Sequence, residues 1–584
     1  MITKKRLLIV IFLFIITLPT FAFLLNNQYF PMHDDQHIAR LYELHQGIQE
    51  GEIYPRWVND FGFGFGYPLF NFYPPLIYYV AELFILMGFS YVMALKAMLI
   101  IGLLLGTLGM FLLARRRTQN VVGLVCAALF TFFSYRAAVI YVRGAFAEFF
   151  ATSLLPFVFL TLINIFEKPT IRNSVIFGGF LALLILSHPL IAFPTFLYLA
   201  IFFITFLYFS GNKLLFFVRS LLGAIFGLAL SAFFWLPSML ERKFTLTDNI
   251  LLKELANYSI HFVYPQQLWH SPWGFGGSGE GFADGMSFQL GKTYIGLAAI
   301  SFLLLVIYWL KNNAKKTDIN LSPVKLYVVY TVLLIFSIFM MTPASALIWE
   351  RVSFLHYLQF PWRFLSFVNV FMALVIGYIS YFLIKIAPPS SRKANIVVAM
   401  IIIVVVIGIQ HKYFRPQSLI AVDEKQRTSR QEIAWEVSGT SFEFSPKGIK
   451  TKKSKYNTTI PDLKESDLPV SDFTIVDGQM TMAKKKNTAH LREYQVNADK
   501  KTTLRLNTFN FPGWAAYVDG VKTKIDDNND FKLMTITIPK GEHEVSFRFE
   551  DTPIRAFAEI VSLMAFVIAV GSVIAETYSV RAKK

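Results

Sequence analysis

The stretch KKRLLIVIFLFIITLPTFAFLL, residues 4–25, decides the class of this protein. A basic cluster, Lys4 to Arg6, precedes an apolar run from Leu7 to Leu25. A run of about 20 apolar residues is long enough to cross a bilayer as a helix. A signal peptide would begin in the same way, but the end of this run, Thr20 to Leu24, is a poor small-residue cleavage site. We therefore expect a retained membrane anchor.

The rest of the 584-residue chain is also strongly apolar. Hydrophobic residues make up 55% of it, and charged residues only 16%, whereas soluble domains carry about 25% charge. This composition excludes a disordered chain, a secreted disulfide scaffold and a soluble cytosolic enzyme. Cys126, the single cysteine, has no partner for an intramolecular disulfide.

The apolar runs predict a polytopic α-helical membrane protein with about twelve spans. The spans are placed at residues 7–25, 92–113, 121–140, 146–166, 173–187, 190–209, 214–237, 293–310, 324–341, 362–386, 394–410 and 554–577. The apolar stretch 74–89 is short for a span, so we interpret it as an interfacial or re-entrant helix on the outer face.

The basic residues predict the orientation. With the N-terminus in the cytoplasm, the basic clusters all fall in inner segments, as the positive-inside rule requires. These clusters are Arg115 to Arg117, Lys168 with Arg172, Lys213, Lys311 with Lys315 and Lys316, Arg392 with Lys393, and Arg581 to Lys584. This placement explains much of the net charge of +17 without nucleic acid. We predict a multi-pass plasma-membrane protein with both termini in the cytoplasm.

Three domains follow from this topology. Residues 1–410 would form the transmembrane domain, with large outer loops at 26–91 and 238–292, and residues 554–584 the last helix and a basic cytoplasmic tail. Residues 411–553 would form an extracytoplasmic β-rich domain. Its apolar residues alternate with polar ones around an Asp519-Gly520 turn, which predicts a small antiparallel β-sandwich.

The first outer loop carries the most informative polar motif. His33, Asp34, Asp35 and His37 stand close together just after the first span. Apolar residues at helical spacing then predict an amphipathic helix over residues 37–50. One aspartate could simply cap this helix, but a cap needs only one carboxylate and no histidine. A catalytic or metal-binding role for at least one aspartate is the alternative we favour.

Further polar residues stand at the predicted outer ends of spans. Arg143 and Glu148 would form either a structural ion pair or part of a site, because charges near the apolar layer are costly. Arg56 and Arg363 are candidates for binding an anionic head group, or they snorkel to the interface. His188 is a lone histidine at an outer turn, where packing or capping is the competing interpretation.

The order of acidic residues resembles the GT-C superfamily of membrane glycosyltransferases, best over residues 1–240. The resemblance implies a sugar taken from a polyprenyl-phosphate or polyprenyl-diphosphate carrier on the outer face. Asp34 or Asp35, followed by Glu148, would match the outer acidic residues of oligosaccharyltransferases. The Trp-Trp-Asp-x-Gly signature of those enzymes is absent, which argues against peptide N-glycosylation.

More closely, the chain is similar to bacterial multi-span proteins labelled 6-pyruvoyl-tetrahydropterin synthase-related and to their YfhO-like relatives, which are implicated in glycosylating envelope polymers. No clustered histidine triad supports the zinc-enzyme activity in that label. The motifs that carry the resemblance are Asp34-x-x-His37, Tyr54-Pro55-Arg56-Trp57, Gly66-Tyr67-Pro68-Leu69-Phe70-x-x-Tyr73-Pro74-Pro75, Arg143-Gly144-x-x-x-Glu148, Phe360-Pro361-Trp362-Arg363, and Phe511-Pro512-Gly513-Trp514 with Val518-Asp519-Gly520.

The resemblance implies a sugar transfer in which Asp34 or Asp35 is the general base, and the match to Asp34-x-x-His37 favours Asp34. The catalytic candidates are Asp34, Asp35 and Glu148, and the substrate-binding candidates are His37, Arg56, Trp57, Tyr73, Arg143, His188 and Arg363. Mg²⁺ or Mn²⁺ held by Asp34, Asp35, His37 and Glu148 is compatible with this scheme but not required. The expected partners are the lipid-linked donor, membrane lipids and an envelope polymer or glycolipid acceptor, and not nucleic acid.

Two other classes compete with this interpretation. A transporter or lipid flippase is disfavoured because the spans contain few carboxylates, and the polar residues gather on one face rather than at the midplane. A non-catalytic scaffold that presents the β-domain is the other rival.

Overall fold

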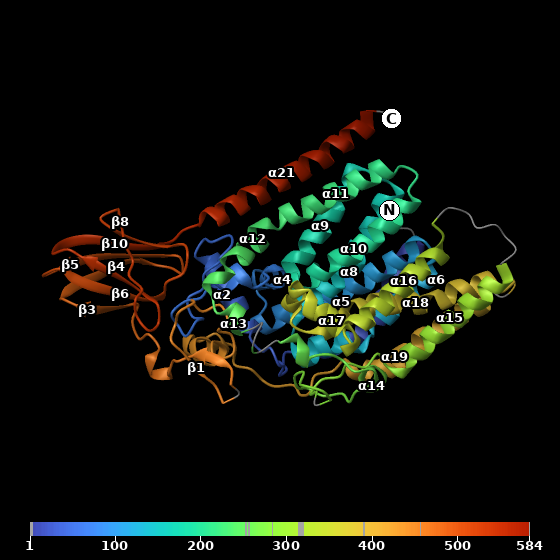
Figure 1. Ribbon diagram of the computed structural model, residues 1–584, viewed down its shortest axis with the longest axis horizontal. Coiled ribbons are helices and arrows are strands. Elements are labelled where there is room, and N and C mark those ends of the chain that lie inside the picture. The colour runs from blue at the N-terminus through green and yellow to red at the C-terminus, as the bar shows by residue number, and fades with distance from the viewer. Residues whose placement is uncertain are drawn as a thin grey trace.

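The computed structural model describes residues 4–250, 254, 257–282, 284–312, 321–388, 390, 392–455 and 457–582. Lys315, Lys316, Lys583 and Lys584, which the orientation argument uses, lie outside the described residues. The chain forms a helical body with a β-sandwich at one end (Figure 1).

Among the described residues, ten helices are long and apolar enough to cross a membrane, which confirms the polytopic class. Nine of them match predicted spans closely. The ten helices are α1 (Lys4–Phe21, continued by η1, Ala22–Leu25), α5 (Tyr91–Arg116), α8 (Phe146–Glu167), α10 (Pro189–Phe209), α11 (Lys213–Leu230), α15 (Lys292–Asn312), α16 (Pro323–Met340), α18 (Leu365–Ile386, preceded by η8, Pro361–Phe364), α19 (Arg392–Gln410) and α21 (Pro553–Ala582).

Three of the twelve predicted spans are bent, short or divided and do not form a single long, straight helix. The span predicted at 121–140 is α6 (Asn120–Thr131) and a second helix over Ser134–Arg143, with a bend of 46° between them. The span at 173–187 is the shorter helix α9 (Ile171–Ser187), and the one at 214–237 divides into α11 and α12 (Ala232–Glu241).

The shorter helices connect these elements. They include α2 (His37–Gln49), α3 (Leu69–Phe72), α4 (Leu76–Ile85), α7 (Ser134–Ala137), η2 (Ala138–Arg143), η3 (Arg242–Phe244), α13 (Thr247–Ile250), α14 (Pro265–Trp269), α17 (Ala346–Arg351) and α20 (Glu424–Arg427). The ten residues of α4 are too few to span a bilayer, which agrees with the predicted interfacial or re-entrant helix.

Helix α8 lies at the centre of the helical body and packs against α5 and α9. Glycines on α5 let the two backbones approach closely: a Cβ at Gly102 would lie 2.6 Å from the ring of Phe149, and one at Gly109 would lie 2.7 Å from that of Phe157. Small residues at such spacing are typical of membrane helix interfaces. This packing fixes the first turn of α8, which carries Glu148.

The β-sandwich is formed by a five-stranded and a three-stranded antiparallel sheet, as predicted. The strand order is β4-β5-β10-β7-β8 in the first and β3-β6-β9 in the second. Asp519 and Gly520 have φ of 52° and 77°, as a two-residue type I′ hairpin turn requires. The strands are β3 (Phe473–Asp477), β4 (Met480–Asn487), β5 (Leu491–Ala498), β6 (Thr502–Phe509), β7 (Trp514–Val518), β8 (Val521–Thr523), β9 (Leu533–Ile538) and β10 (Gly541–Phe549), with a separate pair β1 (Thr451–Lys453) and β2 (Thr459–Pro461).

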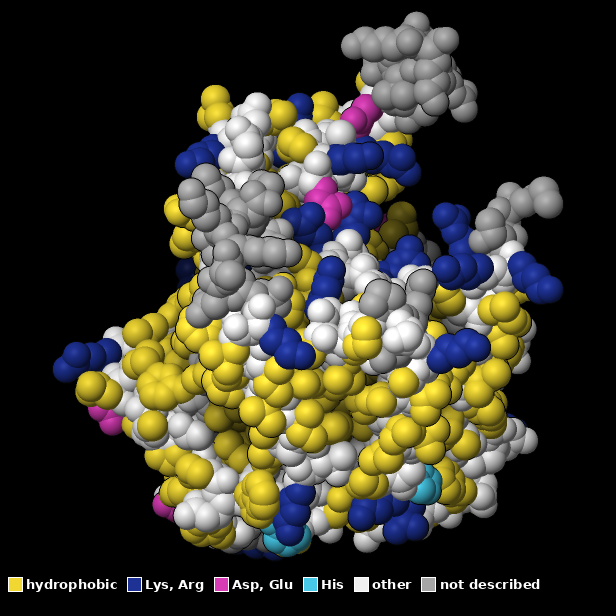
Figure 2. Space-filling view, turned by 90° about the vertical axis from the view of Figure 1, so that its right-hand side faces the viewer, with side chains coloured by type: hydrophobic (Ala, Val, Ile, Leu, Met, Phe, Trp, Pro, Cys, Tyr) yellow, Lys and Arg dark blue, Asp and Glu magenta, His cyan; other side chains and the backbone are white. Residues whose placement is uncertain are grey.

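The helical body has two different ends. Both termini lie at the end away from the sandwich (Figure 1), and Figure 2 looks onto that end and shows Lys and Arg side chains at many places. There Arg116 and Arg117 pair with Glu167, and the Arg172 backbone N–H donates to Glu576. We call this the basic end and the opposite one the sandwich end. Helix α2, which begins three residues after Asp34, lies at the sandwich end (Figure 1).

Candidate active site

Glu148 is the centre of a buried charge cluster. Its side chain has no exposed surface, and one of its oxygens, Oε2, lies 2.8 Å from Arg143 Nη1 and 3.4 Å from Arg363 Nε. The other oxygen accepts a hydrogen bond from the Tyr135 hydroxyl. A buried carboxylate requires such partners, because an uncompensated charge there is very unfavourable.

A tight turn brings Arg143 and Glu148 together. The π-helix η2 ends at Arg143, and Gly144 follows with φ of 69° before α8 begins at Phe146. That left-handed conformation favours glycine, and a Cβ at Gly144 would lie 2.5 Å from the sulfur of Met32. The last residue of one helix therefore faces the first turn of the next.

Arg143 keeps hydrogen-bonding capacity for a ligand. One of its guanidinium nitrogens donates to Glu148 and Tyr135, and the guanidinium lies 4.3 Å from the ring centroid of Trp362. Among the described residues, its other two nitrogens have no hydrogen-bond partner. Arg363, by contrast, also donates to the Leu358 carbonyl and to Gln359.

The loop that carries Asp34 is attached to this cluster by its backbone. The N–H groups of His33 and Asp34 donate to the carbonyls of Val142 and Arg143, at 3.0 and 2.8 Å. The Asp34 side chain remains 44% exposed and lies 2.8 Å from His33 Nδ1. Burial raises the pKa of Asp34, but the hydrogen bond from His33 and the charge of Arg143 outweigh this effect, so the pKa is lowered. Asp34 is therefore an ionised carboxylate beside an arginine.

His37, the first residue of α2, is fully buried. Its Nε2 contacts the Gly144 carbonyl, which can only accept, so Nε2 carries the proton and Nδ1 accepts from the Tyr78 hydroxyl at 3.0 Å. The ring stacks on Phe146 at 4.1 Å. Burial and the charge of Arg40 lower the pKa of His37 to about 3. A neutral, fully buried His37 thus holds α2 against the Gly144 turn.

Asp35 points away from the cluster. One carboxylate oxygen accepts from the Tyr29 hydroxyl at 2.8 Å, and the other lies 2.6 Å from Arg427 Nη2. The Tyr29 backbone also pairs with Ile420. Asp35 therefore joins the loop after α1 to the segment that precedes the sandwich, and both of its oxygens are occupied.

The remaining predicted binding residues divide into two groups. His188 lies close enough to Glu148 and Arg363 to interact with them electrostatically, and its Nδ1 is buried with no hydrogen-bond partner among the described residues. Tyr73 lies beside α2, where the guanidinium of Arg40 stacks over its ring at 3.8 Å.

Arg56 and Trp57 form contacts elsewhere. Arg56 Nη2 lies 2.8 Å from a Glu559 oxygen on α21 and 2.9 Å from the Phe233 carbonyl. Trp57 packs edge-on against Trp514 of β7, with 5.5 Å between the ring centroids. Both residues connect the first outer loop to the last helix and the sandwich.

The described residues contain no group of three His, Cys, Asp or Glu side chains placed to hold a metal ion. Of the four predicted ligands, Asp35, His37 and Glu148 are each engaged with protein partners, and only Asp34 presents an exposed carboxylate. The four do not form a ligand set in this arrangement. The metal site stays a prediction.

Two residues of the site were not predicted from the sequence. Tyr135, which donates to Glu148, stands in a predicted span beside Arg136, and this polar pair within an apolar run was a usable signal. Arg427, the partner of Asp35, is 392 residues away in sequence, and no local pattern indicates that pairing.

Comparison with known proteins identifies the family. Residues 70–414, more than half of the chain, match the sequence pattern of the 6-pyruvoyl-tetrahydropterin synthase related domain, a membrane protein family. The chain belongs to this family. Arg143, Glu148, His188 and Arg363 lie within the matched range. Among curated proteins, none matches this chain.

Two solved membrane glycosyltransferases are similar in structure. The mycobacterial arabinofuranosyltransferase AftD aligns at a TM-score of 0.45 and 15% identity, over 72% of this chain and 28% of its own. The oligosaccharyltransferase AglB from Archaeoglobus fulgidus, solved with an inhibitory peptide and a dolichol-phosphate, aligns at 0.38 and 13%, over 73% and 56%. The chain thus spans less than two thirds of either protein.

Proposed function

We propose that this family member transfers a sugar from a polyprenyl-phosphate carrier to a cell-envelope glycan, lipid or polymer. The sandwich end would face away from the cytoplasm, because the basic end carries the Lys and Arg residues that favour the cytoplasmic side. The site would then open at the outer surface of the plasma membrane, where lipid-linked sugars and envelope acceptors meet.

The observation that carries the proposal is the attachment of Asp34 to the arginine cluster. Asp34 carries an ionised, partly exposed carboxylate, and its backbone N–H donates to the backbone carbonyl of Arg143. The guanidinium of Arg143 has two nitrogens without a hydrogen-bond partner among the described residues. A transferase with a lipid-phosphate donor needs both parts: a base for the acceptor hydroxyl and a cation for the phosphate that leaves. Asp35 offers no comparable free oxygen.

The proposed reaction is a single displacement. The acceptor hydroxyl attacks the anomeric carbon, its proton moves to an Asp34 oxygen, and the bond from that carbon to the phosphate oxygen breaks. The polyprenyl phosphate leaves with the electron pair, and Arg143 offsets its charge by charge-assisted hydrogen bonds. Glu148 holds Arg143 and Arg363 in place. One displacement inverts the configuration at the anomeric carbon.

The test uses the full-length protein in lipid vesicles with polyprenyl phosphates that carry labelled sugars. Membranes and envelope polymers from cells lacking the gene serve as acceptors. We expect a labelled glycosidic product whose mass matches a component missing in those cells. Movement of label across the membrane without such a product would instead indicate a transporter or flippase. Full function of the isolated 411–553 segment in cells would indicate a scaffold.

His33 gives the reaction a predicted pH dependence. The hydrogen bond to Asp34 raises the pKa of His33 above 6.5. Protonated His33 donates a charge-assisted hydrogen bond to the Asp34 oxygen, and its positive charge, which makes that oxygen less basic, is lost as the pH rises through that pKa. Asp34 itself stays ionised throughout, since its pKa is lowered. The transfer rate should therefore increase as the pH rises through the pKa of His33, and His33→Gln should remove this increase.

A second histidine provides a matched control. His543, on β10, lies 2.6 Å from Asp519, and that hydrogen bond also raises its pKa. His543→Gln should leave the pH–rate profile unchanged, because the pair is remote in sequence and lies in the sandwich. A profile that shifts equally in both variants would contradict the role assigned to His33.

A further inference from the structure

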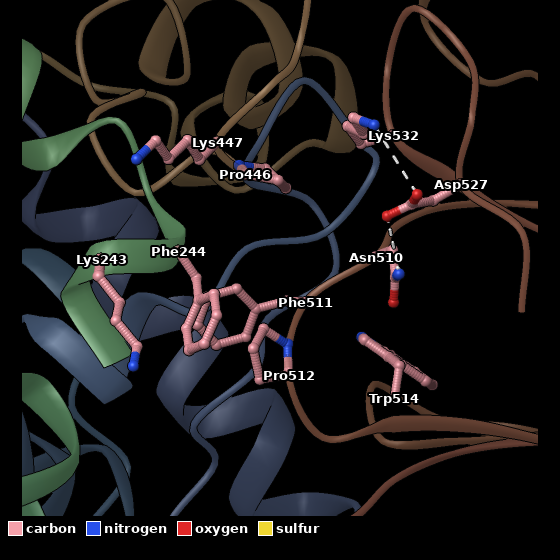
Figure 3. A pocket seen from close by; sticks show the side chains of 10 residues that line it. All are labelled: Lys243, Phe244, Pro446, Lys447, Asn510, Phe511, Pro512, Trp514, Asp527 and Lys532. Atoms are coloured by element: carbon pink, nitrogen blue, oxygen red, sulfur yellow. Dashed lines mark hydrogen bonds and ion pairs between the residues drawn. The ribbon is translucent and has the colours of Figure 1, made fainter. Parts of the chain in front are cut away.

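A pocket of about 430 Å³ lies where the sandwich meets the helical body. Figure 3 shows Lys243 and Phe244 of η3 on one side, and Asn510, Trp514 and Asp527 of the sandwich on the other. Its walls thus come from segments far apart in the chain, so the pocket exists only when the two parts are packed together.

The pocket is positively charged. Its charged lining residues are Lys243, Lys447, Lys532 and Asp527, a surplus of two positive charges. Lys532 lies 3.7 Å from Asp527. The ammonium groups of Lys243 and Lys447 have no acidic partner among the described residues. Two uncompensated lysines at the mouth of a pocket favour an anionic ligand.

The rest of the lining combines aromatic rings with hydrogen-bonding groups. Phe244 is 41% exposed, whereas Phe511 and Trp514 are largely buried, and the rings of both contact Trp57. Asn510 donates to Asp527 at 3.0 Å and keeps its amide oxygen for a ligand. Apolar walls with a few polar groups are typical of small-molecule sites.

Trp514 supplies an independent indication of a ligand. Its Nε1 is buried and, among the described residues, has no hydrogen-bond partner. Figure 3 shows the nitrogen-bearing edge of Trp514 facing the space between Asn510 and Pro512. Buried donors are nearly always satisfied, so an acceptor from a ligand or an ordered water belongs at this point.

We propose that this pocket binds an anionic saccharide of the acceptor. Aromatic faces fit the apolar side of a sugar ring, Asn510 and Trp514 fit its hydroxyl groups, and Lys243 and Lys447 fit a carboxylate or phosphate on it. The role of this saccharide as acceptor rests on the proposed function, but its binding does not.

The pocket lies within reach of Asp34. Gln36 donates to the Thr440 carbonyl at 3.1 Å, and the chain continues from Thr440 to Pro446 and Lys447 at the pocket. Seven residues span at most about 25 Å even when fully extended. A glycan several sugars long could therefore occupy the pocket while its end hydroxyl lies at Asp34.

The experiment measures binding to the full-length protein in detergent. The probes are an oligosaccharide of uronic acids, the neutral oligosaccharide of the same length, and inorganic phosphate. We expect the charged oligosaccharide to bind most tightly and more weakly at high salt. Lys243→Gln combined with Lys447→Gln should lower its affinity by about tenfold, and Phe244→Ala should lower it as well. All three residues are exposed, so these variants should fold.

Two controls separate the outcomes. Lys500→Gln removes an exposed lysine of the sandwich outside the pocket and should bind normally. Asp34→Asn should also bind normally, so a loss of transfer without a loss of binding concerns the proposed function alone. Equal binding of the neutral oligosaccharide, competition by phosphate alone at similar concentration, or unchanged binding in the double lysine variant would each overturn the inference.

Discussion

Replacing Asp34 with asparagine is expected to lower the rate of sugar transfer by about 10²- to 10⁴-fold, the usual contribution of a general base. Asparagine has nearly the same shape, and the backbone hydrogen bonds from residues 33 and 34 to Val142 and Arg143 do not involve the side chain. The variant should therefore fold and insert normally. Transfer of labelled sugar in vesicles, normalised to the amount of inserted protein, measures the effect.

Asp35→Asn is the matched control in the adjacent position. Asp35 is bound to Tyr29 and Arg427, so its replacement weakens the attachment of the segment before the sandwich but removes no base. We expect most of the transfer activity to remain. Full activity in Asp34→Asn, or a loss confined to Asp35→Asn, would contradict the assignment of the base.

The class of fold was predictable because its signals are local. An apolar run of sufficient length has few alternatives to a membrane helix, and the alternating strands around Asp519-Gly520 carry their own turn chemistry. The bend between Thr131 and Ser134 was not predictable in this way. No Gly or Pro stands between Leu124 and Arg143, so no helix-breaking residue marks the position of the bend.

The site was predictable only in part, for a related reason. Arg143 and Glu148 are five residues apart, so their proximity could be inferred from the sequence, and the ion pair is present. Arg363 joins the same carboxylate from 215 residues away, which no spacing reveals. Arg56 also stands among aromatic residues in the sequence, but its ion-pair partner, Glu559, is 503 residues away, so no local pattern indicates that pair.

Replacing Glu148 with glutamine should produce the largest loss of stability among single variants of this site. Arg143 and Arg363 would then remain buried beside each other without a compensating charge. Removing one partner of a buried ion pair typically costs about 3–5 kcal/mol. We expect a clearly lower melting temperature in detergent, and weaker donor binding where folded protein remains, since Arg143 loses its anchor.

The other end of the same helix provides the control. Glu167 ends α8 and pairs with Arg116 and Arg117 at the basic end, where these side chains are 20–40% exposed. Exposed ion pairs are worth about 0–1 kcal/mol, so Glu167→Gln should change the melting temperature little. The two variants remove the same charge from the same helix and differ in burial. Equal effects would show that burial of Glu148 does not decide its role, and that the arginines are held by their other contacts.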